Sequence, residues 1–431
     1  MENLKGKDYL KNKLDKKRLR VNLRYKHYEM KNLVRDLNIS TPPQLRNFMS
    51  VLGWNAKAVD SLADRIVFRE FENDNFNLND IFNLNNKDVL CDSAIVGALI
   101  SSCDFIYIIP NGNDMPKLQV LDGSDATGVI DPTTNMLIEG YAVLEKDRYK
   151  RTVLEAYFEK GRTTYYRVGE KPYSVSNVAP YPLLVPIIYR PDAKRPFGRA
   201  RISRACMSIA GSAVRTMKRS EIAAEFFSFP QRYAVGMSED AEPMEKWKAA
   251  MSSFIEITKD DDGDKPTVGQ FQQQAMTPHT EQLKMFASAF AGETGLTMDD
   301  LGFATDNPSS AEAIKASHES LRLTARKAQR TFGTGFLNAG YLAACLRDET
   351  AYKRSELYKT VPKWEPIFEP DASMLTALGD GLIKINQAVP GFLSAANLQD
   401  LTGIVPATRT DNNDLAKQML DTIFGAEGEN E

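Results

Sequence analysis

The residues whose type and spacing could do chemistry are basic, and they lie near the middle of the chain. On a helical wheel, five cations share one face of an expected helix over residues 201–229: Arg201, Arg204, Arg215, Lys218 and Arg219. A row of guanidinium and ammonium groups binds phosphates without reading base sequence. A solvated surface helix whose arginines pair with nearby acids explains the same pattern, so both interpretations stay open.

The sequence contains no motif that is typical of an enzyme active site. The sequence has no phosphate loop GxxxxGK[ST], no GxGxxG after a strand, no HExxH, no GxSxG and no zinc-like pairing of cysteine with histidine. The absence of a phosphate loop argues strongly against a nucleotide-hydrolysing motor. The acidic run at residues 260–264 lacks the alternating ligands of a calcium loop and is typical of a hairpin turn. We therefore expect no enzyme activity, no metal and no cofactor.

Composition sets the broad class. With 431 residues, 42% of them hydrophobic, the chain should form two or more packed regions. A net charge of −3 argues against a protein that coats nucleic acid, so any DNA contact should be local or weak. Four scattered cysteines predict free buried thiols: Cys91, Cys103, Cys206 and Cys345. Residues 181–189, the most apolar stretch, are too short for a membrane span, and we expect a soluble protein made in a reducing cytoplasm.

The first half of the chain predicts an α+β lobe. Residues 5–36 carry a dense basic run, which predicts either an arm that touches nucleic acid or a solvated helix. Short helices are expected at 44–52 and 57–65, and a longer one at 87–101. Strands are expected at 66–71, 105–109, 118–121, 142–144, 152–158 and 163–168. The lobe spans 66–190, and residues 180–191 form its extended exit.

The second half predicts two helical arms around an insertion. The insertion has strands at 231–235, 254–258 and 268–271. A polar loop at 297–310 leads to a long helix at 311–348, with a bend expected at Gly333, Gly335 and Gly340. Helices at 372–389, 394–401 and 412–424 precede a disordered acidic tip at 427–431.

This order of elements resembles the portal protein of tailed bacteriophages, of the siphophage type. The similarity rests on RPFGRARI from Arg195 to Ile202 and NPSSAEAI from Asn307 to Ile314, with a long helix, an insertion and a second helix between them. Trp54 followed by VDSLADRI from Val59 to Ile66 adds to it. The resemblance covers most of the chain, and its specificity lies in the order of the phrases.

The resemblance implies an α+β, portal-like fold with an α/β wing, a two-helix stem, a small α/β clip, a long wing helix and a helical C-terminal crown. The implied domains are the N-terminal helices and wing at 1–198, the first stem helix at 199–229, the clip at 230–277, the second stem helix at 278–296, the tunnel loop at 297–310, the long helix and return to the wing at 311–364, and the crown and tail at 365–431.

The same resemblance implies a structural function without enzyme activity. Copies, typically twelve in that family, form a ring around the DNA channel at one capsid vertex, used for genome packaging, retention and ejection. Implied partners are other copies of the chain, double-stranded DNA without sequence specificity, the terminase large subunit, the head-tail adaptor, and the major capsid and scaffolding proteins. The implied location is the virion, after assembly in the host cytoplasm.

Three implied sites follow. The basic face of the first stem helix would line the channel, and the clip strands would be completed by a neighbouring subunit. The tunnel loop would act through Phe303, Ala304, Thr305, Asp306 and Asn307, unless it is an ordinary connector. The clip would bind partners through Trp247, Lys259, Asp261 and Asp262. Two alternatives from other classes are a helical accessory subunit of a DNA-processing enzyme, which needs an acidic metal cluster, and a monomeric binding module.

Overall fold

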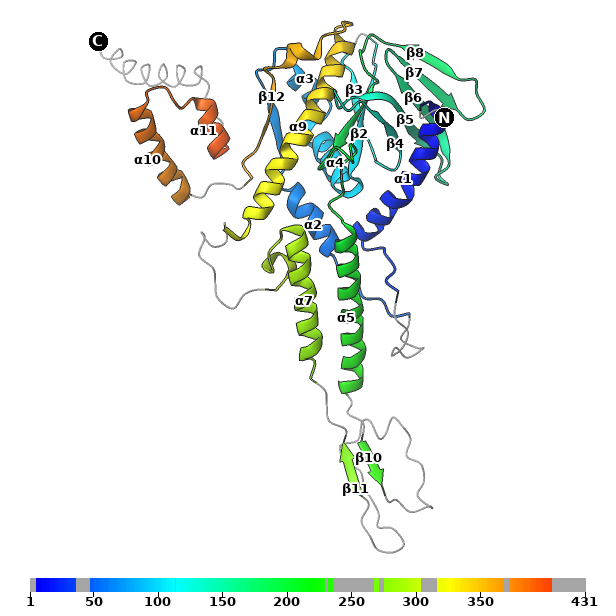
Figure 1. Cartoon of the computed structure of the whole chain (residues 1–431), viewed down its shortest axis with the longest axis vertical. Coiled ribbons are helices and arrows are strands. Elements are labelled where there is room, and N and C mark those ends of the chain that lie inside the picture. The colour runs from blue at the N-terminus through cyan, green and yellow to red at the C-terminus, as the bar shows by residue number, and fades with distance from the viewer. Residues whose placement is uncertain are drawn as a thin grey trace, which may run out of the picture. The chain divides into compact units, whose positions relative to one another are not determined.

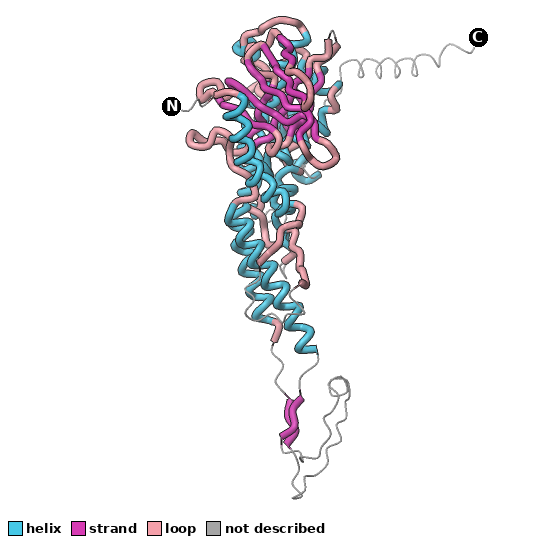
Figure 2. The backbone as a smooth tube through the Cα atoms, turned by 90° about the vertical axis from the view of Figure 1, so that its right-hand side faces the viewer, coloured by secondary structure: helices cyan, strands magenta, loops and turns pink. Residues whose placement is uncertain are grey.

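The computed structural model describes residues 5–35, 47–112, 114–228, 232–235, 267–270, 275–303, 316–367 and 372–404. The chain divides into two compact units. Unit 1 contains Met1–Arg18, Ser61–Ala200 and Arg322–Glu431, and unit 2 contains Leu19–Asp60 and Arg201–Leu321. Helices and strands are mixed, as expected for an α+β protein (Figures 1 and 2). No helix among the described residues is long and apolar enough to cross a membrane.

Unit 1 contains two antiparallel sheets of more than two strands. The larger is a meander in the order β4-β5-β6-β7-β8, and the smaller has the order β3-β2-β9. Helix α4, Lys87–Ser101, packs against the smaller sheet, as its continuous apolar residues require. The strands are β2 (Cys103–Ile109), β3 (Lys117–Leu121), β4 (Ala126–Ile130), β5 (Leu137–Lys146), β6 (Thr152–Glu159), β7 (Arg162–Arg167), β8 (Tyr173–Ser176) and β9 (Leu184–Ile188).

Strand β9 corrects one expectation. Residues 180–191 were expected to be an extended exit, but Leu184–Ile188 pairs with β2, with Pro186 opposite Phe105. Proline has no N–H to donate, which a central strand would need. Strand β9 lies at the edge of its sheet, so the missing donor costs no ladder bond.

A third sheet joins residues far apart in the sequence. Strand β1, Phe68–Glu72, pairs antiparallel with β12, Val361–Trp364, a segment where no strand was expected. Phe68 lies 5.4 Å from Phe336 and 5.5 Å from Trp364, measured between ring centroids. These side chains form an aromatic core in unit 1 together with Phe71 of β1 and with Phe82, which lies in helix α3 (Leu78–Leu84).

Helix α9, Glu319–Arg347, is continuous through the three glycines that predicted a bend. Each glycine allows a close approach. A Cβ at Gly333 would lie 2.6 Å from Pro362 Cγ, and one at Gly335 would lie 2.7 Å from Ile187 Cδ1. At Gly340 the nearest atom, in the side chain of Leu78, would be 3.1 Å away. The glycines therefore let α9 pack closely on β12, β9 and α3.

Unit 2 is built on helices α5, Arg204–Ser228, and α7, Thr277–Thr294, which lie side by side in Figures 1 and 2. Helix α2, Trp54–Ala63, brings Trp54 within 5.6 Å of Phe290, between ring centroids. The unit also contains the short strands β10, Arg232–Val235, and β11, Thr267–Gln270, which pair antiparallel.

Several expected boundaries differ from the structure. Residues 47–52 are not helical, against the expected helix at 44–52. In the long helix, a turn at His318 separates α9 from residues 316 and 317, and residues 311–315 lie outside the described ones. Helices α10, Ala372–Ala388, and α11, Ala395–Thr402, confirm two of the three C-terminal helices. The third, with the acidic tip, lies outside the described residues.

Candidate functional site

Helices α5 and α7 form the two arms predicted from the sequence, and they run antiparallel. The hydroxyl of Ser203, just before α5, donates to Glu293 near the end of α7 at 2.8 Å, and Thr216 donates to Gln282 at 2.9 Å. Small buried residues face the partner helix, so the two backbones can approach closely. These residues are Ala210 and Ala213 on α5, and Ala287 and Ala291 on α7.

Arg201 does not belong to an exposed basic face. Helix α5 begins only at Arg204, because the Ser203 side chain accepts from the N–H of Cys206 at 3.1 Å and ends the extended segment there. Arg201 is 7% exposed and donates to the carbonyls of Ala58 and Thr294. Thr294 is the last residue of α7, where a cation also interacts favourably with the helix dipole. Its assignment to the channel surface is corrected: in this chain Arg201 holds α5, α7 and α2 together.

The other four cations do not form one continuous exposed row either. Arg204 is exposed and Arg219 half-buried, whereas Lys218 is only 7% exposed. Arg215 donates to Ser212 at 2.8 Å. Arg215 and Lys218 line a pocket that α5 forms with residues 32–34 and 47–50 of the same unit. The helical wheel could not show this, since the covering segment comes from elsewhere in the sequence.

The first part of the predicted tunnel loop is ordered. The Thr297 N–H and hydroxyl both donate to Asp300 at 2.9 Å, and the Asp300 N–H donates back to Thr297 at 3.1 Å. These reciprocal bonds span the start of the short 3-10 helix η2, Asp299–Leu301, in which Leu301 is buried. Phe303 is half-buried, while Ala304, Thr305, Asp306 and Asn307 lie outside the described residues.

The insertion is described only at its two paired strands, in which Arg232 lies opposite Gln270. The proposed partner-binding residues lie outside the described ones, as does the expected strand at 254–258. They are Trp247, Lys259, Asp261 and Asp262.

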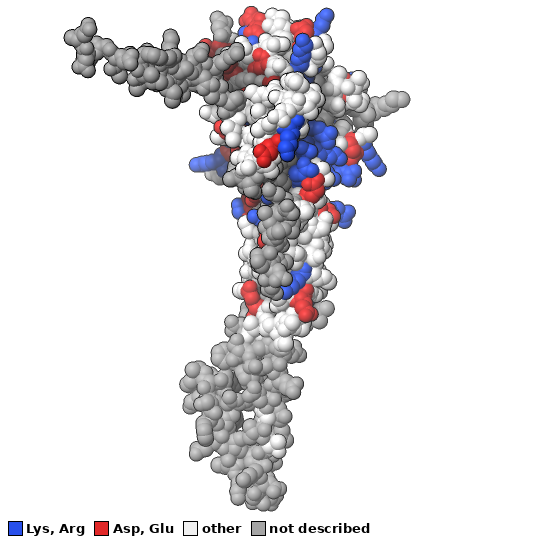
Figure 3. Space-filling model, turned by 90° about the vertical axis from the view of Figure 1, so that its left-hand side faces the viewer, with Lys and Arg blue, Asp and Glu red and all other residues white. Residues whose placement is uncertain are grey.

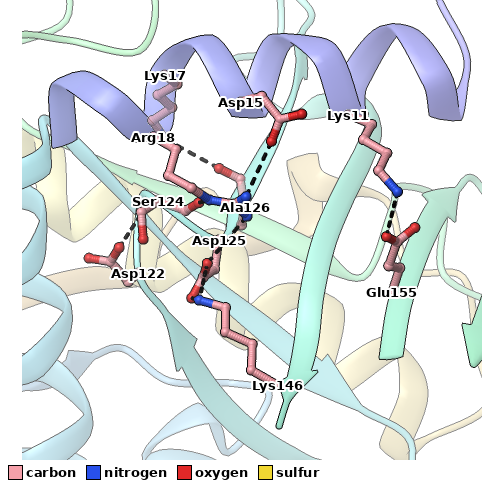
Figure 4. A network of polar contacts seen from close by, with 10 residues as sticks. All are labelled: Lys11, Asp15, Lys17, Arg18, Asp122, Ser124, Asp125, Ala126, Lys146 and Glu155. Atoms are coloured by element: carbon pink, nitrogen blue, oxygen red, sulfur yellow. Dashed lines mark hydrogen bonds and ion pairs between the residues drawn. The ribbon is translucent and has the colours of Figure 1, made fainter. Parts of the chain in front are cut away.

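Helix α1, Lys7–Tyr28, contains the contacts that the sequence interpretation missed. Two of its cations donate to backbone carbonyls beside the five-stranded sheet of unit 1: Lys13 to Gly128 at 2.7 Å, and Arg18 to Ser124 at 3.0 Å. Lys11 forms a 2.7 Å ion pair with Glu155 (Figure 4). Leu10 and Leu14 are buried against Tyr141 and Val143.

The first half of α1 is therefore neither a free arm nor a solvated helix. Leu10 and Leu14, four residues apart, were the available signal of a buried face. Burial lowers the pKa of Lys13, with Lys17 acting in the same direction. Burial raises the pKa of Glu155, but the hydrogen bond and charge of Lys11 outweigh it and leave that pKa below its usual value.

The described residues contain no group of three or more His, Cys, Asp or Glu side chains that could hold a metal ion. The four cysteines are free and buried, as predicted. Burial raises the pKa of Cys103 to about 12 and that of Cys345 to about 11, which leaves both thiols protonated and unreactive at neutral pH.

Comparison with known proteins gives relatives of one kind. The family model described as "Phage portal protein, SPP1 Gp6-like" matches residues 7–371. The portal protein of Mycobacterium phage L5 is 23% identical over 340 residues, covering 74% of this chain and 69% of that protein. The portal protein of Mycobacterium phage D29 is 24% identical over 347 residues, covering 75% and 70%.

Two solved structures are also similar. The virion of a native gene transfer agent particle has a chain with a TM-score of 0.44 and 14% identity, covering 82% of this chain and 90% of that one. The neck of the native particle, computed with C12 symmetry, gives a TM-score of 0.44 and 14% identity, covering 90% and 100%. A TM-score of 0.44 is too low to support an argument, so the assignment rests on the sequence family. Because that family model matches residues 7–371, including both helices of the α5/α7 pair, the chain belongs to the SPP1 Gp6-like family of phage portal proteins.

Proposed function

We propose that copies of this chain form a homododecameric ring around the DNA channel at one vertex of a phage capsid, and that DNA passes through it during packaging, retention and ejection. The capsid portal role follows from the family. The observation that carries the ring is the α5/α7 pair. The two helices bury one face each against one another and keep other side chains exposed, whereas a helical bundle would enclose a core of its own.

DNA contact in this proposal is weak and local. Close-packed phosphates must slide past the protein, which repeated contacts without base recognition allow. On the face drawn in Figure 3, Lys and Arg side chains form one larger group and several scattered ones, and much of the described surface is uncharged. Arg204 is exposed on α5, and Arg219 is half-buried but does not line the pocket that contains Arg215 and Lys218, so we assign the channel contact to Arg204 and Arg219.

The remaining partners are assigned by position in the chain. We place the terminase large subunit and the head-tail adaptor at the clip, residues 230–277, and the major capsid and scaffolding proteins at the wing. The chain acts as a structural subunit without enzyme activity. Assembly takes place in the host cytoplasm, before the ring enters the virion.

Purified protein tests the ring directly. It should have a native mass far above the 48.2 kDa monomer, and negative-stain images should show rings with a central hole. A monomer at micromolar concentration, at both low and high salt, would rule out the ring and favour a monomeric binding module.

A further inference from the structure

Unit 2 has a pocket on one side of α5 with both apolar and basic walls. Its volume is 430 Å³, and the residues that matter are Val34, Phe48, Met49, Val214, Arg215 and Lys218. Large apolar side chains beside it remain in solvent: Leu33 is 81% exposed, Met49 61% and Phe48 42%. Exposed apolar side chains that cluster at a pocket mark a surface that another molecule covers.

A second exposed surface of unit 2 lies on helix α7. Thr216 of α5 faces α7, whereas Val214 and Arg215 line the pocket on a different side of α5. On α7, Glu281 and Met285 are exposed one turn apart, so both project from the same face. Lys284 is exposed on the flank of that face. Unit 2 therefore has two distinct surfaces. The pocket beside α5 is apolar and basic, and the exposed face of α7 has the apolar Met285 next to the acidic Glu281.

A closed ring needs two such surfaces. Each copy contacts the next through a heterologous interface, in which two different patches of the chain meet. Rotation about a ring axis that runs along the helix pair keeps each residue at the same height in every copy. The bond between Thr216 and Gln282 puts Gln282 at the height of Arg215 and Lys218. The Glu281 and Met285 of the next copy would arrive at the height of the pocket.

We infer that the pocket beside α5 binds the α7 face of the neighbouring copy, with Met285 in the apolar part and Glu281 beside Arg215. This inference rests on the proposed ring, and it identifies the two surfaces through which neighbouring copies contact each other. Arg215 and Lys218 then contact protein, and the DNA contact of α5 is restricted to the cations outside the pocket. Each pocket is incomplete without the neighbouring copy.

Disulfide trapping tests the contact. Chains carrying Met49→Cys are mixed with chains carrying Met285→Cys and assembled, then oxidised and run on a non-reducing gel. We expect a covalent dimer that neither variant forms alone. The four native cysteines are buried and give little background. Lys171→Cys, on an exposed turn of unit 1, is the matched control partner for Met285→Cys and should give no dimer.

Charge reversal is the second test. Arg215→Glu should raise the concentration needed for assembly about tenfold, since it places like charges together. Adding Glu281→Arg should restore assembly, and Lys171→Glu should leave it unchanged. If rings form but the Met49→Cys and Met285→Cys chains give no covalent dimer, this interface is wrong and the portal function stands. The same holds if the Arg215→Glu, Glu281→Arg double variant does not recover assembly. Absence of rings in the unmodified protein would overturn the proposed function and the interface with it.

Discussion

At the scale of single residues, Arg201 and Arg204 show how neighbouring arginines on one helical wheel take different roles. Arg201 precedes the helix and is enclosed by two carbonyls that accept its hydrogen bonds, while Arg204 begins the helix and is exposed. A buried guanidinium stabilises the fold only while its donors are paired, because an unpaired buried charge is costly. The exposed arginine has no such constraint.

Replacing Arg201 should therefore destabilise the protein. We expect Arg201→Ala to cost about 3 kcal/mol, since two carbonyls lose a charged donor. Arg204→Ala is the matched control and should change stability by less than about 0.5 kcal/mol. Urea unfolding of both variants checks this. Equal effects would mean that the bonds of Arg201 contribute nothing.

Asp104 gives a prediction about pH. It is buried, and burial together with the charge of Asp122 raises its pKa to about 8. The carboxyl is therefore protonated in the folded state at neutral pH and ionised in the unfolded state. A raised pKa of an acid means that its contribution to stability falls as pH rises from the unfolded value, about 4, to about 8.

Asp104→Asn should remove that pH dependence. The amide oxygen can still accept from the Ser101 hydroxyl and the Gly123 N–H, which lie 2.6 and 2.9 Å from the aspartate. We expect the variant to be more stable than the native protein at pH 8 by at least about 1 kcal/mol, with the difference disappearing near pH 4. Melting temperatures measured across that range provide the test, and parallel curves would contradict it.

At the scale of elements, helix α1 is positioned by packing as well as by charge. Leu14 is 1% exposed against the sheet, while Leu19 is 76% exposed on the same helix. Leu14→Ala should therefore cost about 2–4 kcal/mol through lost burial and the cavity it leaves. Leu19→Ala should cost less than about 0.5 kcal/mol. A free basic arm would tolerate both changes equally, which hydrogen exchange of unit 1 and thermal melting would reveal.

At the scale of the whole molecule, the proposed tunnel loop would contact DNA in the assembled ring. Residues 297–310 contain three aspartates and no Lys or Arg, so we expect close approach to phosphates to be mildly repulsive and any contact with DNA to be weak. Changing Phe303, Thr305 and Asn307 to Ala or Gly should leave rings intact and lower the amount of DNA packaged or retained. Native-mass measurement supplies the control. Full packaging by intact variant rings would mean that the loop is an ordinary connector.

The sequence by itself determined features that depend on local chemistry. The apolar run at residues 87–101 predicted α4 with the bounds that the structure shows, and the two helical arms followed from periodicity. Isolated cysteines in apolar surroundings predicted buried thiols, which is correct. The order of two short phrases around the arms predicted the portal family. Each of these signals is contained in a short window, where side-chain pattern and local geometry are directly linked.

Only the tertiary structure decided features that depend on distant residues. Strand β12 is recognised only through its pairing with β1, which is distant in the sequence, and Pro186 is compatible with a strand only because β9 lies at the edge of its sheet. The helical wheel grouped Arg201 with the stem cations, but carbonyls of α2 and α7 bury it. A helical wheel shows which residues share a face of a helix. It contains no information about which other segments of the chain cover that face, so a buried cation and an exposed one look alike on it.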